Sequence, residues 1–461
     1  MMFQNIHSVY FIGIGGIGMS ALARWFKQRG LAVGGYDRVK TELTMNLEKE
    51  GISVHYEDNP DAVTSNFKEQ TSVLVIYTPA VPATHKELSF FRDHQFLLKK
   101  RSEVLGMISK DHFTVAVGGT HGKTTTSSMI AHLLHGSAQG CSAFIGGIMT
   151  NYNSNLLIGD ADAPVVAEAD EFDRSFLRLF PDYTILTSLD PDHLDIYGDE
   201  SEMHKTYVEF LELSEAPSKL LLHEDTIGKL EDLLLGRKFE TFGLAGKDVC
   251  CENLQVADGF NTFDYVGREK IEGLKLQLPG YHNVSNALAA ITVALDLGVT
   301  KDQIKAQMGS YLGVKRRFEY QIKTKNCVYI DDYAHHPSEI EALISSVRLL
   351  YPGKKITLVF QPHLFSRTRD FREGFIESLS LADEVIMLPI YPARELPIEG
   401  ITSEIIRSEL TVENRLLEKS DFPDCLNKIQ TDVLLTVGAG DIDQLVPQIK
   451  SFLERKEGVS L

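Results

Sequence analysis

The sequence predicts an α/β protein of three domains, each built on a mostly parallel sheet. Short apolar runs alternate with helical patterns along almost the whole chain, which is typical of doubly wound sheets. Glycine-rich turns join a strand to a helix near residues 13 and 119. The chain also has 461 residues, which is too long for a single hydrophobic core and suggests about three domains.

The first region, residues 1–108, alternates strands and helices from its start. Residues 9–12 predict a strand, residues 19–29 a helix, residues 32–36 a second strand and residues 73–77 a third strand that ends at a proline-containing turn. The pattern restarts around residues 106–112, with the strand that leads into the second glycine turn. We therefore place the first domain boundary there.

Two further regions complete the chain. The second, residues 109–313, has a later part, about residues 219–280, with more strand-and-turn character. The third, residues 314–461, again alternates strands with helices, so we expect a further α/β domain. The expected strands are 113–117, 164–168, 183–187, 327–330, 356–360, 384–388 and 433–437, and the expected helices are 127–134, 286–297 and 337–350.

Composition and charge limit the classes of protein to which the chain can belong. Hydrophobic content of 43% and charged content of 24% are those of an ordinary globular protein. The formal charge of −18 argues against general nucleic-acid binding, which needs a basic surface. We find no apolar stretch near the ~18 residues of a membrane span, no signal-peptide pattern and no C-x-x-C pair. We therefore expect a cytoplasmic protein without membrane insertion, either monomer or homodimer.

The second glycine turn has the features of a phosphate-binding loop. The octapeptide Gly-Thr-His-Gly-Lys-Thr-Thr-Thr occupies residues 119–126, between an apolar strand and a helical pattern. Such a turn directs backbone N–H groups at an anion, and Lys123 and Thr124 add a mobile cation and a hydroxyl that can bind Mg²⁺. Gly119 and Gly122 lie closer together than in the usual P-loop. We predict ATP binding through the phosphates; the alternative is a plain glycine turn with a solvated lysine.

A first glycine loop, Gly-Ile-Gly-Gly-Ile-Gly, occupies residues 13–18 between a strand and a helix, and Asp37 ends the next strand. This arrangement fits a dinucleotide fingerprint with the acid on a ribose hydroxyl. The physical requirement is only a diphosphate at a helix N-terminus, so a UDP-sugar would satisfy it equally well. A glycine-rich tight turn without a ligand is the third possibility.

Two acidic segments, residues 168–173 and 190–195, each follow a predicted strand. Mg²⁺ prefers carboxylate, hydroxyl and water oxygens around substrate phosphates. We therefore predict Thr124, Glu168 and His193 as metal ligands, with Asp170 and Glu171 as alternatives to Glu168. The other acids are expected to cap helices or hold turns, and His193 can equally be a hydrogen-bonded structural histidine.

A third group of polar residues occurs in the later part of the chain. His282, Asn283 and Asn286 open a helical run and can bind a base or ribose, although asparagine near a helix start is also a common cap. Segments rich in arginine and histidine at 316–317, 331–337 and 361–369 fall at turns, strand ends or helix starts, where ligands bind in open α/β sheets. Their composition favours phosphate and carboxylate recognition.

In their order along the chain, these segments resemble the Mur ligases of peptidoglycan synthesis, and most closely the alanine-adding branch of that family. The resemblance extends from the loop at 13–20 to the turn at 438–440. The Thr-His-Gly-Lys-Thr-Thr form of the phosphate loop is specific to the wider family. Asp-Asp-Tyr-x-His-His-Pro, together with Phe-Gln-Pro-His and Arg-Thr-Arg-Asp, is specific to the alanine-adding branch.

The resemblance implies an ATP-dependent ligase that uses Mg²⁺ and joins L-alanine to the carboxyl group of UDP-N-acetylmuramate. In the family, that carboxylate attacks the γ-phosphate of ATP to give an acyl phosphate, and the amine of the amino acid then displaces phosphate. The loop at 13–18 would hold the diphosphate of the sugar nucleotide, with no nicotinamide involved. The protein would mainly position the reactants and neutralise charge.

Motif matching to the family assigns roles to individual residues. ATP is expected at Gly119, Thr120, His121, Gly122, Lys123, Thr124, Thr125, Asn283, Arg317, Asp332 and His335. The sugar nucleotide is expected at Gly13, Gly15, Gly16, Ile17, Gly18, Asp37 and Arg367. One Mg²⁺ is expected at Thr124 and Glu168 and a second at His193. The expected catalytic set is Lys123, His193, His335 and Arg317.

Two positions depart from the family pattern. Some relatives carry arginine directly after the histidine of Gln-Pro-His, where this chain has Leu364. Several other Mur ligases use a carbamylated lysine as a metal bridge, but the corresponding residue here is about Val208, so we expect no carbamate.

Three other functions are alternatives to an alanine-adding ligase. They are a nicotinamide dehydrogenase, a P-loop ATPase or switch, and the related enzyme that recycles a whole tripeptide onto the same sugar.

Overall fold

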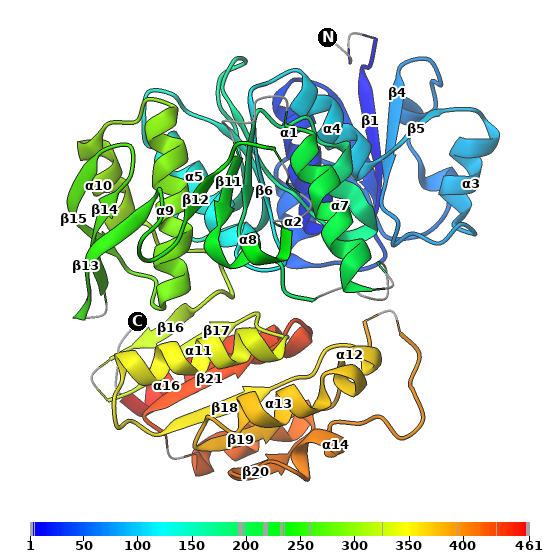
Figure 1. Cartoon of the computed structure of the whole chain (residues 1–461). Coiled ribbons are helices and arrows are strands. Elements are labelled where there is room, and N and C mark those ends of the chain that lie inside the picture. The colour runs from blue at the N-terminus through cyan, green and yellow to red at the C-terminus, as the bar shows by residue number, and fades with distance from the viewer. Residues whose placement is uncertain are drawn as a thin grey trace. The chain divides into compact units, whose positions relative to one another are not determined.

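The computed structural model describes residues 3, 5–191, 197, 199–214, 220–230, 234, 236–257, 260–324, 326–393, 395–429 and 431–457. The chain divides into two compact units (Figure 1). The first unit comprises residues 1–254, 263–275 and 282–312, and the second comprises residues 255–262, 276–281 and 313–461.

A five-stranded sheet with the order β3-β2-β1-β4-β5 begins the first unit, and all its pairings are parallel. Its strands are β1 (Ser8–Ile12), β2 (Ala32–Tyr36), β3 (Ser53–His55), β4 (Val73–Tyr77) and β5 (Leu97–Lys100). The helices between them are α1 (Ile17–Gln28), α2 (Glu42–Lys49) and α3 (Lys86–Asp93), and α4 (Arg101–Lys110) follows.

The side chains of β1 alternate between two apolar layers, as a strand requires. Val9 and Phe11 belong to a cluster that includes Phe26 of α1, whereas Tyr10 belongs to a second cluster with Phe91 of α3. Because both faces are covered, the strand is buried along its whole length. The sheet therefore holds the first glycine loop, which follows Ile12, on a rigid support.

The second sheet of this unit has seven strands in the order β12-β11-β10-β6-β9-β7-β8. Its strands are β6 (Thr114–Gly118), β7 (Ser142–Met149), β8 (Ser154–Leu157), β9 (Val165–Glu168), β10 (Tyr183–Leu186), β11 (Leu220–His223) and β12 (Glu240–Phe242). The central strand β6 pairs in parallel with β9 and β10. The carboxyl ends of these three strands therefore meet at one edge, where the phosphate loop begins.

Several helices accompany this sheet, and most of α5 is buried. They are α5 (Lys123–His135), α7 (Glu200–Glu212), α8 (Glu224–Leu230), α9 (Tyr281–Asp296) and α10 (Lys301–Ser310), together with the short helix η3 (Phe172–Arg178). A smaller sheet of β13 (Cys250–Ala257), β14 (Phe260–Val266) and β15 (Lys270–Leu276) accounts for the strand-and-turn character expected there.

The second unit contains a six-stranded sheet with the order β16-β17-β21-β18-β19-β20. Its strands are β16 (Glu319–Lys323), β17 (Val328–Asp332), β18 (Ile356–Phe360), β19 (Glu384–Met387), β20 (Glu413–Leu416) and β21 (Val433–Val437), and only β16 pairs antiparallel among the described pairings.

Helices cover both faces of this sheet. Helices α11 and α13 lie side by side against one face (Figure 1), where they pack in a cluster with Ile330 of β17. On the other face, Tyr329 joins a cluster with residues of α15 and α16. The helices of this unit are α11 (Pro337–Leu350), α12 (Phe365–Asp370), α13 (Arg372–Leu379), α14 (Glu404–Arg407), α15 (Phe422–Cys425) and α16 (Val446–Glu457).

The predicted fold class, α/β with mostly parallel sheets, is confirmed. The boundaries expected after residues 108 and 313 stay a prediction. Within the described part of the chain, no helix is both long enough and apolar enough to cross a bilayer.

Candidate functional site

The phosphate loop lies between the buried strand β6 and helix α5, as the sequence predicted. Gly119 has φ of +132° and Gly122 has φ of +81°, both in the region that favours glycine. A Cβ atom at Gly119 would lie 2.2 Å from Oγ1 of Thr187, so the backbone approaches β10 too closely for any side chain. The resulting cradle fits an anion, because the first N–H groups of α5 have no intrahelical partner.

The loop is also fixed by side chains that follow β10. The backbone N–H of His121 donates to Oγ of Ser188 over 2.6 Å, and the hydroxyl of Thr187 donates to the carbonyl of His121 over 2.5 Å. Oγ1 of Thr120 accepts the N–H of Asp190 over 2.9 Å. The loop is therefore held in one conformation by its neighbouring strand.

The side chain of Lys123 folds over this loop. Its Nζ donates to the carbonyl of Gly119 over 2.6 Å and to the carbonyl of Thr120 over 3.2 Å, and it lies 2.9 Å from a carboxylate oxygen of Glu171. Burial alone lowers the pKa of the Lys123 ammonium, but the carboxylates of Glu171 and Glu168 outweigh burial and hold that pKa above its ordinary value. Lys123 is therefore held in its charged form beside the loop.

Thr124 and Glu168 bring two oxygen donors together beside the loop. The buried hydroxyl of Thr124 donates to Oε1 of Glu168 over 2.8 Å, and Oε2 accepts the N–H of Gly146 over 2.8 Å. A hydroxyl and a carboxylate within contact distance are a hard donor set that suits Mg²⁺. The described residues contain no cluster of three His, Cys, Asp or Glu side chains placed for a metal, and the predicted ligand His193 lies outside those residues.

Helix α9 brings two asparagines to the same loop. Asn283 and Asn286 are both buried, and the Oδ1 atom of Asn286 would lie 2.9 Å from a Cβ at Gly122. The amide of Asn286 donates to Oδ1 of Asn283 over 3.5 Å. Asn286 therefore contacts the phosphate loop directly, and Asn283, which the sequence assigned to ATP, lies next to Asn286.

The first glycine loop joins β1 to α1 and is supported by Asp37. Oδ2 of Asp37 accepts the N–H of Gly15 over 2.7 Å, and Oδ1 accepts the N–H of Val39 over 3.1 Å. Gly13 has φ of +88°, and Gly16 precedes the first turn of α1. The helix N-terminus and the close backbone approach suit a diphosphate. The sequence placed Asp37 on the ligand, whereas in the structure its carboxylate also fixes the loop.

Basic residues at the start of α4 connect this loop to the acidic segment 168–173. Arg101 lies against the first turn of α1, since a Cβ at Gly18 would be 3.1 Å from its side chain. Its guanidinium donates to Asp170 over 2.9 Å, and Lys100 lies 3.2 Å from Asp173. Sequence reasoning missed Arg101, because nothing in a local motif marks a contact that spans 69 residues.

The second unit brings together residues of the 316–318 and 331–337 segments. Asp332 accepts the N–H of Phe318 over 2.6 Å and the N–H of Ala334 over 2.7 Å. Burial raises the pKa of Asp332 to about 7 against the effect of these two N–H groups. Arg316 donates to the carbonyl of Gly438 over 2.6 Å and so supports the turn that follows β21. The predicted site residue Arg317 is the next residue in the chain.

His335 lies just before α11 in the same unit. Its backbone N–H donates to Glu339 over 2.9 Å, and its ring lies 6.1 Å from that of His363, which stacks on Tyr391. The Gln-Pro-His segment and the predicted histidine pair therefore meet at the carboxyl end of the sheet, where ligands bind in such folds.

Leu364, at which the chain departs from the family pattern, has an unusual backbone. Its φ of +69° is in the region that favours glycine, and it precedes helix α12, which carries Arg367. Glu395 accepts the N–H of Ser366 over 3.0 Å and so caps that helix. The start of α12 is thus strained and tied to a neighbouring loop.

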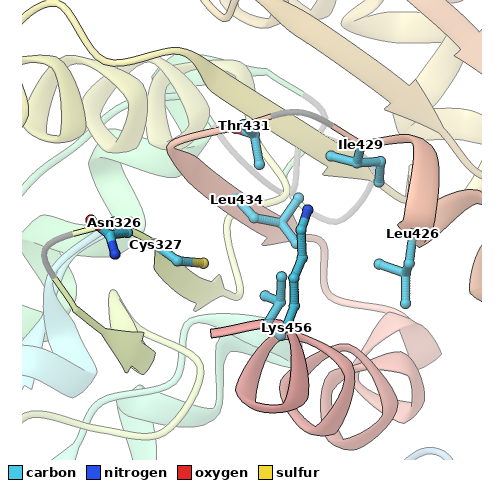
Figure 2. Close-up of a pocket in the computed structure, with 8 residues that line it drawn as sticks. Asn326, Cys327, Leu426, Ile429, Thr431, Leu434 and Lys456 are labelled. Carbon is cyan, nitrogen blue, oxygen red and sulfur yellow. The ribbon is translucent and has the colours of Figure 1, made fainter. Parts of the chain in front are cut away.

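A small pocket of about 40 Å³ lies elsewhere in the second unit (Figure 2). Asn326 and Cys327 line it just before β17 begins, together with Leu434 at the start of β21 and Lys456 near the end of α16. These are the amino ends of the strands, opposite to the ends that carry Asp332 and His335. The pocket has room for water rather than for a nucleotide.

The fold and the first unit's two glycine loops define an α/β phosphate-loop protein with a second loop suited to a nucleoside diphosphate. Three family models match the chain: one described as Mur ligase family, catalytic domain, over residues 8–113; Mur ligase middle domain over 117–294; and Mur ligase, glutamate ligase domain, over 316–442. The chain is 49% identical to the UDP-N-acetylmuramate–L-alanine ligase of Cytophaga hutchinsonii, over 99% of both chains. It is 47% identical to the protein of that name from Phocaeicola vulgatus, over 98% of this chain and 99% of that one. The chain belongs to the Mur ligase family.

Solved structures agree with this assignment. The UDP-N-acetylmuramate–alanine ligase of Thermotoga maritima superposes with a TM-score of 0.80 at 30% identity, covering 98% of this chain and 100% of that one. A murein peptide ligase from Psychrobacter arcticus superposes with a TM-score of 0.69 at 21% identity, covering 96% of this chain and 98% of that one, and shows the same fold. The resemblance inferred from sequence motifs is confirmed.

Proposed function

We propose that this protein joins L-alanine to the carboxyl group of UDP-N-acetylmuramate with consumption of ATP, in peptidoglycan biosynthesis. One observation carries the proposal: two glycine loops, each between a strand and a helix, lie in one compact unit of a chain that is 49% identical to a ligase named for this reaction. The reaction forms an acyl phosphate and ADP when the sugar carboxylate attacks the γ-phosphate. The amine of alanine then forms the amide bond as inorganic phosphate leaves.

In this proposal, the phosphate loop holds the triphosphate of ATP. The N–H groups at the start of α5 bind phosphate oxygens, Lys123 neutralises charge on the β- and γ-phosphates, and Thr124 and Glu168 hold Mg²⁺. The metal, when bound, reduces the repulsion between the phosphates and an incoming carboxylate. Thr124 is already oriented toward Glu168 over 2.8 Å, so little rearrangement of the ligands is needed. His193 as a ligand of a second Mg²⁺ stays part of the proposal.

The sugar nucleotide is assigned to the loop at residues 13–18, with its diphosphate at the N-terminus of α1. Asp37 fixes the backbone of this loop by accepting the N–H of Gly15. Arg317, Asp332, His335 and Arg367, all from the second unit, are proposed to contribute to binding of ATP and of the sugar nucleotide. His335 and Arg317 are the members of the catalytic set from this unit.

Other functions explain fewer of these features. A nicotinamide dehydrogenase uses the first glycine loop but has no need of Lys123 or of the pair Thr124 and Glu168. A P-loop ATPase or switch needs no sugar nucleotide. The tripeptide-recycling ligase shares the fold, but eight relatives that are 45–49% identical to this chain are named UDP-N-acetylmuramate–L-alanine ligase.

Several broader properties belong to the same proposal. We infer three domains, residues 1–108, 109–313 and 314–461, that act as sugar-nucleotide domain, ATP domain and completing α/β domain. We also infer action in the cytoplasm, as a monomer or homodimer, on small-molecule substrates.

The test is release of ADP from ATP with each reactant omitted in turn. The proposal predicts release only when UDP-N-acetylmuramate, Mg²⁺ and L-alanine are all present. Release that is independent of the sugar nucleotide would favour the P-loop ATPase instead.

A further inference from the structure

The ammonium group of Lys123 has all three of its N–H bonds directed at oxygen atoms of the chain itself. Two acceptors are the carbonyls of Gly119 and Thr120, and the third is the carboxylate of Glu171, at 2.6, 3.2 and 2.9 Å. A lysine has three donors and no acceptor. A phosphate oxygen can therefore bind Nζ of Lys123 only by displacing or sharing one of these partners.

Glu171 is the strongest of the three partners. All three bonds are charge-assisted because the donor is an ammonium, but only the carboxylate adds the attraction of a full opposite charge. Glu171 is also only 4% exposed, so little water screens the pair. A carboxylate this deeply buried needs a partner, and Lys123 supplies it.

The backbone around Glu171 holds its side chain at this position. Its carbonyl accepts the hydroxyl of Tyr197 over 2.8 Å and the N–H of Arg174 over 3.0 Å. The next turn contains two consecutive left-handed residues, Asp173 with φ of +54° and Arg174 with φ of +52°. Such a conformation persists only where the surrounding structure fixes it. The backbone of Glu171 is thus fixed beside the phosphate loop.

We propose that Glu171 is a positioning residue that holds Lys123 and competes with the nucleotide's phosphates for the lysine ammonium. This inference rests on the proposed function, since it concerns how the ATP-binding loop works. The competition weakens nucleotide binding and so favours release of ADP after each turnover. Glu171 therefore acts through Lys123, and its role differs from that of Glu168, which contacts Thr124.

The experiment measures ATP binding by isothermal titration calorimetry on the full chain, in buffer with EDTA so that no turnover occurs. Glu171→Gln removes the competing charge and keeps the shape of the side chain. We expect it to bind ATP about fivefold or more tightly than the unsubstituted protein. Glu171→Asp, which withdraws the carboxylate by one methylene, is expected to bind with intermediate affinity.

Asp173→Asn is the matched control. It removes one negative charge from the same segment, at an exposed side chain that pairs with Lys100, and asparagine tolerates the left-handed backbone. Because exposed ion pairs contribute little energy, its affinity for ATP should stay within about twofold of that of the unsubstituted protein. An equal gain in Asp173→Asn and Glu171→Gln would overturn the proposal in favour of a general charge effect.

The remaining outcomes are also decisive. Folded Glu171→Gln protein with unchanged or weaker ATP affinity contradicts competition for Lys123. If circular dichroism shows that Glu171→Gln does not fold, the comparison of Glu171→Asp with the unsubstituted protein decides, and equal affinities contradict the proposal. Failure of the unsubstituted protein to bind ATP even with Mg²⁺ would refute the proposed function itself.

Discussion

The hydroxyl of Thr124 donates a hydrogen bond of 2.8 Å to Glu168, whose second oxygen accepts the N–H of Gly146. Thr124 lies in the first turn of α5 and Glu168 ends β9, so the contact joins the phosphate-loop helix to the neighbouring strand. Two hard oxygen atoms are thereby placed side by side at the loop. This contact supports Glu168, among the acids of the 168–173 segment, as the metal ligand.

Glu168→Gln should raise the Mg²⁺ concentration needed for half-maximal ADP release by at least about tenfold, because an amide is a poorer ligand for a hard cation. The measurement is a magnesium titration at saturating substrates. Asp170→Asn is the control, because the carboxylate of Asp170 is already paired with Arg101. A normal magnesium requirement in Glu168→Gln with a raised one in Asp170→Asn would move the metal to Asp170.

Lys123→Met should abolish ADP formation and also lower stability. The substitution removes the charge that neutralises phosphate, and it leaves the buried carboxylate of Glu171 without its ammonium partner. We expect the free energy of unfolding to fall by about 1–3 kcal/mol, reduced from the value for a fully buried pair because Lys123 is partly exposed. Chemical denaturation and ADP release are the two measurements.

The double variant Lys123→Met with Glu171→Gln separates these two effects. Its stability should recover toward that of the unsubstituted protein, because no uncompensated charge remains, while ADP formation stays absent. Recovery of activity in the double variant would show that Lys123 serves only to balance Glu171.

Gly15→Ala should weaken binding of the sugar nucleotide and leave ATP binding unchanged. The added Cβ would lie 2.8 Å from Oδ2 of Asp37 and 2.7 Å from Cγ2 of Thr44, so the loop must shift and lose the bond to Asp37. We expect the KM for UDP-N-acetylmuramate to rise at least about tenfold, which corresponds to ~1.4 kcal/mol. Gly228→Ala, in α8 with no atom within 4 Å of the added Cβ, is the control. Equal effects on ATP and on the sugar nucleotide would contradict separate sites.

A buried acid in the first sheet predicts a pH dependence of stability. Glu87 is fully buried, accepts the hydroxyl of Tyr10 over 2.7 Å and lies 3.5 Å from His55. Burial raises its pKa from 4.5 to about 7. Because the folded state holds this proton more tightly than the unfolded state, the stabilisation is complete below the unfolded pKa and is lost as pH rises toward 7.

Glu87→Gln should therefore be more stable than the unsubstituted protein at pH 8, by about 1–3 kcal/mol, with the difference shrinking toward pH 4. Denaturant unfolding at these pH values measures it. Glu57→Gln, at an exposed position of the same region, is the control, and its stability should match that of the unsubstituted protein at each pH. Stability curves for Glu87→Gln and the unsubstituted protein that run parallel across this range would refute the raised pKa.

The elements that local sequence specifies were predicted closely. Strands β2 (Ala32–Tyr36) and β18 (Ile356–Phe360) have the predicted bounds, because a buried parallel strand is a continuous apolar run between turns. Both glycine loops were also predicted, since strand, turn and helix are adjacent in the chain. By contrast, β5 (Leu97–Lys100) was missed, because half of it consists of lysines at the edge of the sheet.

Contacts between distant residues could not be predicted from one sequence. Glu171 was an alternative metal ligand on composition alone, but the fold pairs it with Lys123, 48 residues away. Asp37 was assigned to the ligand, and only the structure reveals its bond to Gly15. These contacts depend on how strands are ordered in the sheets, and no local pattern encodes that order.

The most direct test of the account is the mass of the product formed from ATP, Mg²⁺ and UDP-N-acetylmuramate when L-alanine and the tripeptide of peptidoglycan recycling are supplied together at equal concentration. We predict a single new sugar nucleotide, heavier than the substrate by one alanine less one water, and ADP in equal amount. A product that carries the tripeptide, or ADP without any new sugar nucleotide, would contradict the assignment of this chain as an alanine-adding ligase.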